Sequence, residues 1–176
     1  MSRKAVIVFS LWTSFFSALF YFLYGLLPGL FAGLGYGGFL PCGWIMFVCL
    51  AVYFGMGLGP KDAPSAILSA FCGLIWGQVD FLLNDLFLLI PRIPGDLAMF
   101  LSVVVGTAVT MFIHIHLLKN TPFRQMPFVF AGVCLTFSQG GGNKIGLVTT
   151  FVVGILLCMI CTFMMGWAGK KWPETK

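Results

Sequence analysis

The sequence predicts an all-α integral membrane protein of six transmembrane helices, arranged as two inverted three-helix repeats with glycine-rich broken-helix turns. Three observations predict this fold. Hydrophobic residues make up 60% of the 176 residues and charged residues only 9%, whereas charged residues are about 25% of a soluble domain. Six apolar segments follow one another along the chain, and two of them end in similar glycine-rich turns. Most basic residues also fall on one predicted side of the membrane.

We expect residues 1–176 to form one transmembrane domain, with repeat 1 at about residues 5–90 and repeat 2 at about residues 95–168. Six helices of about 20 residues leave no room for a soluble catalytic or receptor domain. The ten Lys and Arg residues are scattered in ones and twos. They form no basic face for nucleic acid, so we expect lipid and a small solute as partners, and no nucleic acid.

The first half contains three apolar segments. The first, Ala5–Leu27, is too long and aromatic for a cleaved signal peptide. The glycines from Gly29 to Gly38 follow it, and we expect them to pack against helices or lie at the interface, because lipid-exposed coil leaves backbone groups unpaired. The second segment, Pro41–Phe54, is short. The third begins after Asp62, a good N-cap residue, and runs to about Phe87.

The second half repeats this order. The segment Pro91–Asp96 is the clearest break in the chain and divides it near its middle. A fourth apolar segment follows at Leu97–Leu118. The fifth, Met126–Phe137, is again short and again ends in a glycine cluster, and the sixth is Ile145–Trp167.

The distribution of positive charge favours six spans with both termini in the cytoplasm. This arrangement leaves two basic residues outside, Arg92 and Lys144, and eight inside: Arg3, Lys4, Lys61, Lys119, Arg124, Lys170, Lys171 and Lys176. Such a bias agrees with the positive-inside rule. An odd number of spans would place the two charged termini on opposite sides and remove the bias.

The two glycine-rich turns look like copies of one another. Residues 53–61 and 136–144 share Phe, two Gly and Lys at a spacing of 83 residues. Three spans separate the copies, so the second enters the membrane from the opposite side, as in the inverted repeats of many transporters. The alternative is that both turns are ordinary loops of a duplicated helical bundle.

Two blocks of the chain, Phe54 to Gly77 and Ala131 to Gly140, carry a resemblance to a known family. Together with the order of short span, glycine-rich turn and helix, they resemble the domain-of-unknown-function 1097 family of small bacterial inner-membrane proteins, over about Ala32 to Trp167. The family motif is of the type Thr-Phe-Ala-Gly-Gln-Gly, and this chain departs from it at Ser138. The resemblance implies a multi-span protein of the bacterial inner membrane and no catalytic residues.

We expect the two turns to line a narrow, mostly apolar throat in which Phe54 and Phe137 face one another. The predicted lining residues are Tyr53, Phe54, Gly57, Gly59, Thr136, Phe137, Ser138, Gln139, Gly140 and Gly141. Shedding water costs a neutral polar molecule little compared with an ion. The predicted function is therefore a channel or facilitator for urea, a short amide, ammonia or a small alcohol. The competing interpretation is that the two Phe rings only pack.

Two alternative functions remain open. Lys61 and Lys144 lie at turns that lead into helix N-termini, which favours a small monovalent anion, although Asp62 would neutralise Lys61 and both lysines can extend to headgroups. The second alternative is a non-transporting accessory or structural membrane protein. In either case the helices are rich in small residues that allow close approach, and we expect a homo-oligomer.

The remaining polar residues predict no catalytic, metal or cofactor site. His114 and His116 point to different helix faces, and we expect an interfacial histidine that meets lipid headgroups, with a proton relay as the alternative. Cys158 and Cys161 form a pair without further ligands, which we interpret as packing. Asp80, Asp85 and Asp96 lie near the outer ends of the third and fourth spans, as an acidic vestibule or as exposed loop charges. No hydrolase, metalloprotease or nucleotide-binding motif occurs, so we do not expect an enzyme.

Overall fold

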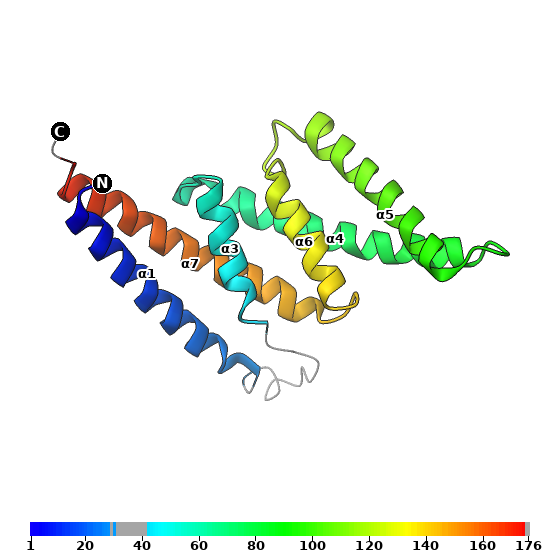
Figure 1. The fold of residues 1–176 in the computed structure, drawn as a ribbon, viewed down its shortest axis with the longest axis horizontal. Helices are drawn as coiled ribbons and strands as arrows, with labels where there is room; N and C mark the ends of the chain where they lie inside the picture. The colour runs from blue at the N-terminus through cyan, green and yellow to red at the C-terminus, as the bar shows by residue number, and fades with distance from the viewer. Residues whose placement is uncertain (29, 31–41, 175–176) are drawn as a thin grey trace. The chain divides into compact units, whose positions relative to one another are not determined.

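The computed structural model describes residues 1–28, 30 and 42–174, and this part of the chain is helical without β-strands (Figure 1). The helices are α1 (Arg3–Tyr24), α3 (Ile45–Gly55), the 3-10 helix η1 (Pro60–Asp62), α4 (Ala63–Leu88), α5 (Gly95–Phe112), the π-helix η2 (Ile113–Leu117), α6 (Met126–Ser138) and α7 (Lys144–Lys171). The glycines between Gly29 and Gly38, and the predicted start of the second span at Pro41, lie outside the described residues.

Four helical stretches are long and apolar enough to cross a membrane: α1, η1 with α4, α5 with η2, and α7. The predicted boundaries of these segments are confirmed to within a few residues. Helices α3 and α6 are shorter, with 11 and 13 residues. At 1.5 Å per residue they extend about 17 and 20 Å, less than the hydrocarbon thickness of about 30 Å. The structure therefore confirms the all-α class and four membrane-length helices.

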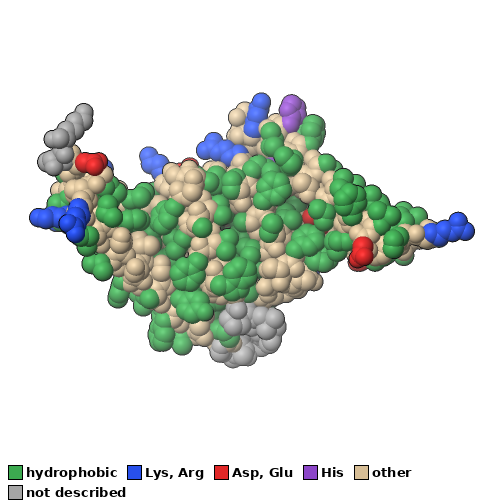
Figure 2. Space-filling view, viewed as in Figure 1, with side chains coloured by type: hydrophobic (Ala, Val, Ile, Leu, Met, Phe, Trp, Pro, Cys, Tyr) green, Lys and Arg blue, Asp and Glu red, His purple; other side chains and the backbone are tan. Residues whose placement is uncertain are grey.

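The exposed surface of the long helices is strongly apolar, as expected of a surface that faces lipid. Large hydrophobic side chains are exposed on every one of the four long stretches, including Leu11 at 67%, Phe100 at 62% and Phe163 at 66%. Figure 2 shows green hydrophobic side chains spread over the visible face, with basic side chains in small groups. Such exposure on a soluble monomer would be an aggregation liability. Together with the four long helices, it indicates a membrane protein.

The chain forms two compact units that do not coincide with its two halves. Unit 1 comprises residues 1–63 and 148–176, and unit 2 comprises residues 64–147. Unit 1 thus contains α1, α3, η1 and nearly all of α7, while unit 2 contains α4 after its first residue, α5, η2 and α6. Each unit has two long helices and one short helix. Helix α4, the third helix of the first half of the sequence, therefore lies in unit 2 with α5 and α6. Helix α7, the third helix of the second half, lies in unit 1 with α1 and α3.

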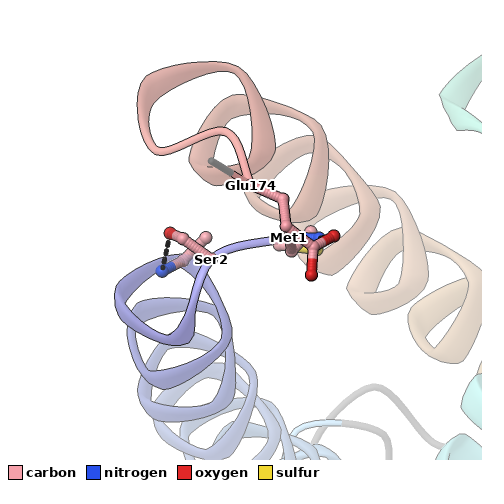
Figure 3. A network of polar contacts seen from close by, with 4 residues as sticks. Met1, Ser2 and Glu174 are labelled. Atoms are coloured by element: carbon pink, nitrogen blue, oxygen red, sulfur yellow. Dashed lines mark hydrogen bonds and ion pairs between the residues drawn. The ribbon is translucent and has the colours of Figure 1, made fainter. Parts of the chain in front are cut away.

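In unit 1, α1 and α7 run antiparallel and are joined at both ends. The N-terminal ammonium group of Met1 lies 3.3 Å from a carboxylate oxygen of Glu174 (Figure 3). Ser2 caps α1 by accepting a hydrogen bond from the backbone N–H of Ala5. At the other end the hydroxyl oxygens of Tyr24 and Thr150 lie 2.5 Å apart. Met1 and Glu174, near the two ends of the chain, therefore lie together.

In unit 2, α4 packs against both α5 and α6. At the α4–α6 crossing, a Cβ added to Gly73 would lie 2.0 Å from the carbonyl oxygen of Val129, and one added to Gly132 would lie 2.5 Å from that of Ala70. The two backbones approach closely because neither glycine carries a side chain. Unit 1 has a related crossing, where Gly154 of α7 faces Cys49 of α3.

Candidate functional site

The first glycine-rich turn ends α3 in a Schellman motif. The C-cap is Met56, and Gly57 follows it with φ +64°. The backbone N–H of Gly57 donates to the carbonyl of Phe54 at 3.0 Å, and that of Leu58 donates to the carbonyl of Tyr53 at 3.1 Å. These two bonds define the motif, and glycine is favoured at the left-handed position because it has no Cβ.

The second glycine-rich turn ends α6 in the same way. The C-cap is Gln139, and Gly140 follows it with φ +57°. The backbone N–H of Gly140 donates to the carbonyl of Phe137 at 2.9 Å, and that of Gly141 donates to the carbonyl of Thr136 at 3.0 Å. Each donor and acceptor lies 83 residues after its counterpart in the first turn. The two segments paired by sequence thus have matching helix-ending geometry.

The similarity between the two turns extends beyond their hydrogen bonds. Cys49 and Gly132 are also 83 residues apart, and each lies where its short helix meets a long helix of the same unit. Each turn is followed by a helix that continues into the other unit, α4 after the first turn and α7 after the second. The glycine-rich turns therefore connect the two units of the fold.

The side chains at the first turn mostly hold the turn itself. Tyr53 is fully buried, and its hydroxyl donates to the carbonyl of Gly59 at 2.5 Å. The backbone N–H of Gly59 in turn donates to a carboxylate oxygen of Asp62 at 2.9 Å. Phe54 contacts Phe9 of α1 edge to face, with ring centroids 5.9 Å apart. The hydroxyl of Tyr53 thus has an internal partner rather than being held free for a ligand.

The second turn is anchored by α4. The ring of Phe137 stacks on that of Phe81 with centroids 4.8 Å apart. The side-chain amide of Gln78 donates to the carbonyl of Gly141 at 2.9 Å. Thr136 is fully buried, and its Cβ would lie 2.6 Å from a Cβ added to Gly77 of α4. The Phe137–Phe81 stack and the Gln78 hydrogen bond fix the position of this turn within unit 2.

The polar side chains predicted at the second turn form hydrogen bonds mostly with other groups of the same turn. The hydroxyl of Ser138 donates to the carbonyl of Leu135 at 2.8 Å. Gln139 is half-buried, and its side-chain oxygen accepts a hydrogen bond from the amide of Asn143 at 3.2 Å. Asn143 itself has φ +49° and directly precedes α7. Of these three residues, Ser138 is exposed, whereas Gln139 and Asn143 are half-buried.

The predicted lining residues are thus divided between the units. Tyr53, Phe54, Gly57 and Gly59 lie together in unit 1. Residues 136–141 lie together in unit 2. That Phe54 and Phe137 face one another across a throat stays a prediction.

Both lysines of the turns have exposed side chains. Lys61 lies in η1, and Lys144 is the first residue of α7. The expected neutralisation of Lys61 by Asp62 is not formed, because the carboxylate of Asp62 accepts from Gly59 and the described residues hold no Lys61–Asp62 ion pair. Both positive charges are therefore without a carboxylate partner at helix starts.

His114 is buried, with 1% of its surface exposed, so it is not the interfacial histidine. Its Nε2 accepts a hydrogen bond from the indole N–H of Trp76 at 3.1 Å, and its Nδ1 lies 2.7 Å from the carbonyl oxygen of Phe123. A carbonyl can only accept, so Nδ1 carries the proton and the ring is neutral. His116 is exposed, which confirms that the two histidines face different ways.

Sequence reasoning also missed the burial of one carboxyl group. Asp85 and Asp96 are exposed, as the loop interpretation expected, but Asp80 is 3% exposed and lies within α4. Cys158 and Cys161 are fully buried in α7, which agrees with packing. In the described ranges, no group of three or more His, Cys, Asp or Glu residues could hold a metal ion.

Comparison with known families supports the resemblance seen in the sequence. The family model described as "Protein of unknown function (DUF1097)" matches residues 18–173. The chain belongs to the DUF1097 family. This match covers α3 to α7, both glycine-rich turns and the C-terminal part of α1. No curated protein and no solved structure matches this DUF1097 protein.

Proposed function

We propose that this DUF1097 protein is a channel or facilitator for a small uncharged polar solute in the bacterial inner membrane. The observation that carries the proposal is the recurrence of one Schellman turn at Gly57 and Gly140, each ending a short apolar helix. Short helices that stop at glycine clusters in corresponding positions of two halves are a pointer to transport sites. Irregular backbone of this kind is tolerated in a bilayer only where it is covered by protein or lines a cavity.

In the proposed arrangement the two halves are inverted repeats. Three helices separate the second copy of the turn from the first, so the two copies enter the bilayer from opposite sides. The placement of α4 in unit 2 and of α7 in unit 1 supports this arrangement, because each unit then contains two long helices and one short helix. The proposed throat lies between the turns and is lined by Phe54, Phe137 and the polar groups beside them. We also propose a homo-oligomer, with both termini in the cytoplasm.

A small monovalent anion is the second candidate solute, and the observation that favours it is the exposure of Lys61 and Lys144. Neither has a carboxylate partner among the described residues. Each lysine is close to the start of a long helix, where free backbone N–H groups add partial positive charge.

Solute flux into proteoliposomes tests the proposal. Swelling measured by light scattering is expected to be faster with the protein than without it for urea, acetamide or glycerol. Lys61→Ala and Lys144→Ala should leave neutral-solute flux unchanged, with Lys119→Ala as the matched exposed-lysine control. If the two lysine variants lose nitrate flux and urea never passes, the anion function replaces the neutral one. If no solute in the panel passes faster than through empty liposomes, the accessory role is correct.

A further inference from the structure

Asp80 is the one buried acidic side chain in the part of the chain that the structure describes. The other four acidic residues are exposed or half-buried, whereas Asp80 is 3% exposed and lies in the membrane-length helix α4. Its Oδ1 atom is buried and has no hydrogen-bond partner among the described residues. Ionisable groups inside a membrane protein are expensive, and those present usually have a function.

The carboxyl group of Asp80 is packed against the backbone of α5. A Cβ added to Gly106 would lie 1.7 Å from Oδ1 of Asp80 and 2.9 Å from its Cγ. The carboxyl group thus occupies the space that any side chain at position 106 would need. The buried residues of α5 recur every four positions, at Ala98, Ser102, Gly106 and Thr110. They form one helix face, and Asp80 is inserted into the middle of it.

Among the described residues, no counter-ion faces this carboxyl group. The ion pair of the described chain, Met1 with Glu174, lies in unit 1. On α4 the other acidic residue, Asp85, is exposed, and Cys72 is half-buried. The α5–η2 segment carries Asp96 and His116, both exposed, and His114, whose two ring nitrogens are occupied by Trp76 and Phe123. Helix α6 carries no charged or imidazole side chain, and its Cys134 is exposed.

An ionised carboxylate at this position would be an unpaired charge in an apolar contact. Such a charge costs far more than an unpaired carbonyl oxygen, and a buried group relieves the cost by taking up a proton. The neutral acid needs no metal ligands, whereas a bound metal cation would need several further oxygen ligands around it. The packing on Gly106 leaves one oxygen of Asp80 against a Cα–H group, which is a weak donor at best.

We propose that Asp80 is a proton-binding site at the α4–α5 contact, with the neutral acid stabilising the contact and the ionised form loosening it. Loss of the proton creates a carboxylate that must gain water or a cation, so α4 and α5 have to separate around Gly106. Acidic conditions therefore favour the closed contact, and the contact is lost as the pH rises. This inference does not require any solute to pass through the protein.

Infrared spectroscopy of the full chain in lipid tests the inference. At mildly acidic pH the protein is expected to show the C=O stretching band of a protonated carboxyl group in apolar surroundings, and the band should weaken as the pH is raised. The band should be absent from Asp80→Asn, which keeps the side-chain shape, and retained in Asp85→Asn, the exposed control on the same helix. Absence of the band from the unsubstituted protein, or its persistence in Asp80→Asn, would overturn the assignment.

A chemical measurement gives the same answer if Asp80→Asn fails to accumulate. Dicyclohexylcarbodiimide is an apolar reagent that adds to protonated carboxyl groups, and the product is located by mass spectrometry. We expect label on Asp80 and not on Asp85 or Asp96, with labelling that falls as the pH is raised. Equal labelling of all three, or protection of Asp80 by added sodium at constant pH, would show an exposed carboxylate or a metal-cation site instead and reject the proton site.

Discussion

At the scale of single residues, the two glycines after the short helices are the most demanding positions of the fold. Gly57 and Gly140 both have φ near +60°, a conformation that costs an L-residue about 1–2 kcal/mol. A Cβ added to either would contact nothing within 4 Å. Any effect of substitution there therefore reports backbone conformation and not crowding.

Replacing either glycine by alanine should destabilise the protein by a similar amount. We expect Gly57→Ala and Gly140→Ala each to lower the free energy of unfolding by about 1 kcal/mol. Gly55→Ala is the matched control, because Gly55 is equally open and is the last residue of α3. Thermal unfolding in detergent measures the difference. Equal transition temperatures for Gly55→Ala and Gly57→Ala would mean that the turn is not formed as described.

At the scale of helices, the α4–α6 crossing depends on two glycines meeting backbone to backbone. The atoms that an added Cβ would meet at Gly73 and Gly132 are carbonyl oxygens and Cα atoms, which cannot rotate away. At Gly154, by contrast, the nearest atom is the sulfur of Cys49, at 2.9 Å. A methyl group there can be accommodated by a rotamer change of Cys49 and a small shift of the backbone at Met46, whose Cα would lie 3.2 Å away.

The expected order of effects follows from this difference. Gly73→Ala and Gly132→Ala should each lower stability by about 1–3 kcal/mol or more, because the helices have to move apart. Gly154→Ala should cost less, and Gly166→Ala, which is open, should cost nothing. Transition temperatures of the four variants in one detergent measure the order. A loss at Gly166 as large as that at Gly73 would contradict the close crossing.

Most helix boundaries are predictable from the sequence because the residues that start and end a helix lie at the boundary itself. The ends of α3 and α6 are marked by glycine at the positions that need positive φ, and the helix starts by Asp62 and Asn143. The pairing of helices is not predictable in this way. An almost wholly apolar helix such as α7 has no distinct apolar face that indicates which helices it contacts. The sequence therefore does not predict that α4 lies in unit 2 and α7 in unit 1.

The same limit applies to the polar residues. The burial of His114 depends on the indole N–H of Trp76, 38 residues earlier in the chain, and on a backbone carbonyl. Asp80 lies close enough to the end of its segment to resemble a loop charge, and its burial depends on the absence of a side chain at Gly106. The sequence signal for this burial was Gly106, which lies in a series of small residues spaced four apart on α5. Contacts between distant segments decided both positions.

At the scale of the whole molecule, the orientation in the membrane can be measured directly. The charge distribution predicts a cytoplasmic Lys176 and an external Gly95. Reporter fusions at these two positions should therefore give opposite signals, and Met1 should report the same side as Lys176, because the chain ends of unit 1 lie together. A cytoplasmic signal at Gly95 would overturn the number of spans.

The central claim is that a solute passes between the two glycine-rich turns, and blocking that passage by thiol modification tests it most directly. In a background with the six native cysteines replaced by alanine, Phe54→Cys and Phe137→Cys place one thiol at each turn, and Leu89→Cys places one at an exposed control position. Urea flux into proteoliposomes is measured before and after a small thiol reagent. The account predicts a large loss of flux at positions 54 and 137 and none at 89. Unchanged flux at both turns, with the thiols shown to be modified, would contradict it.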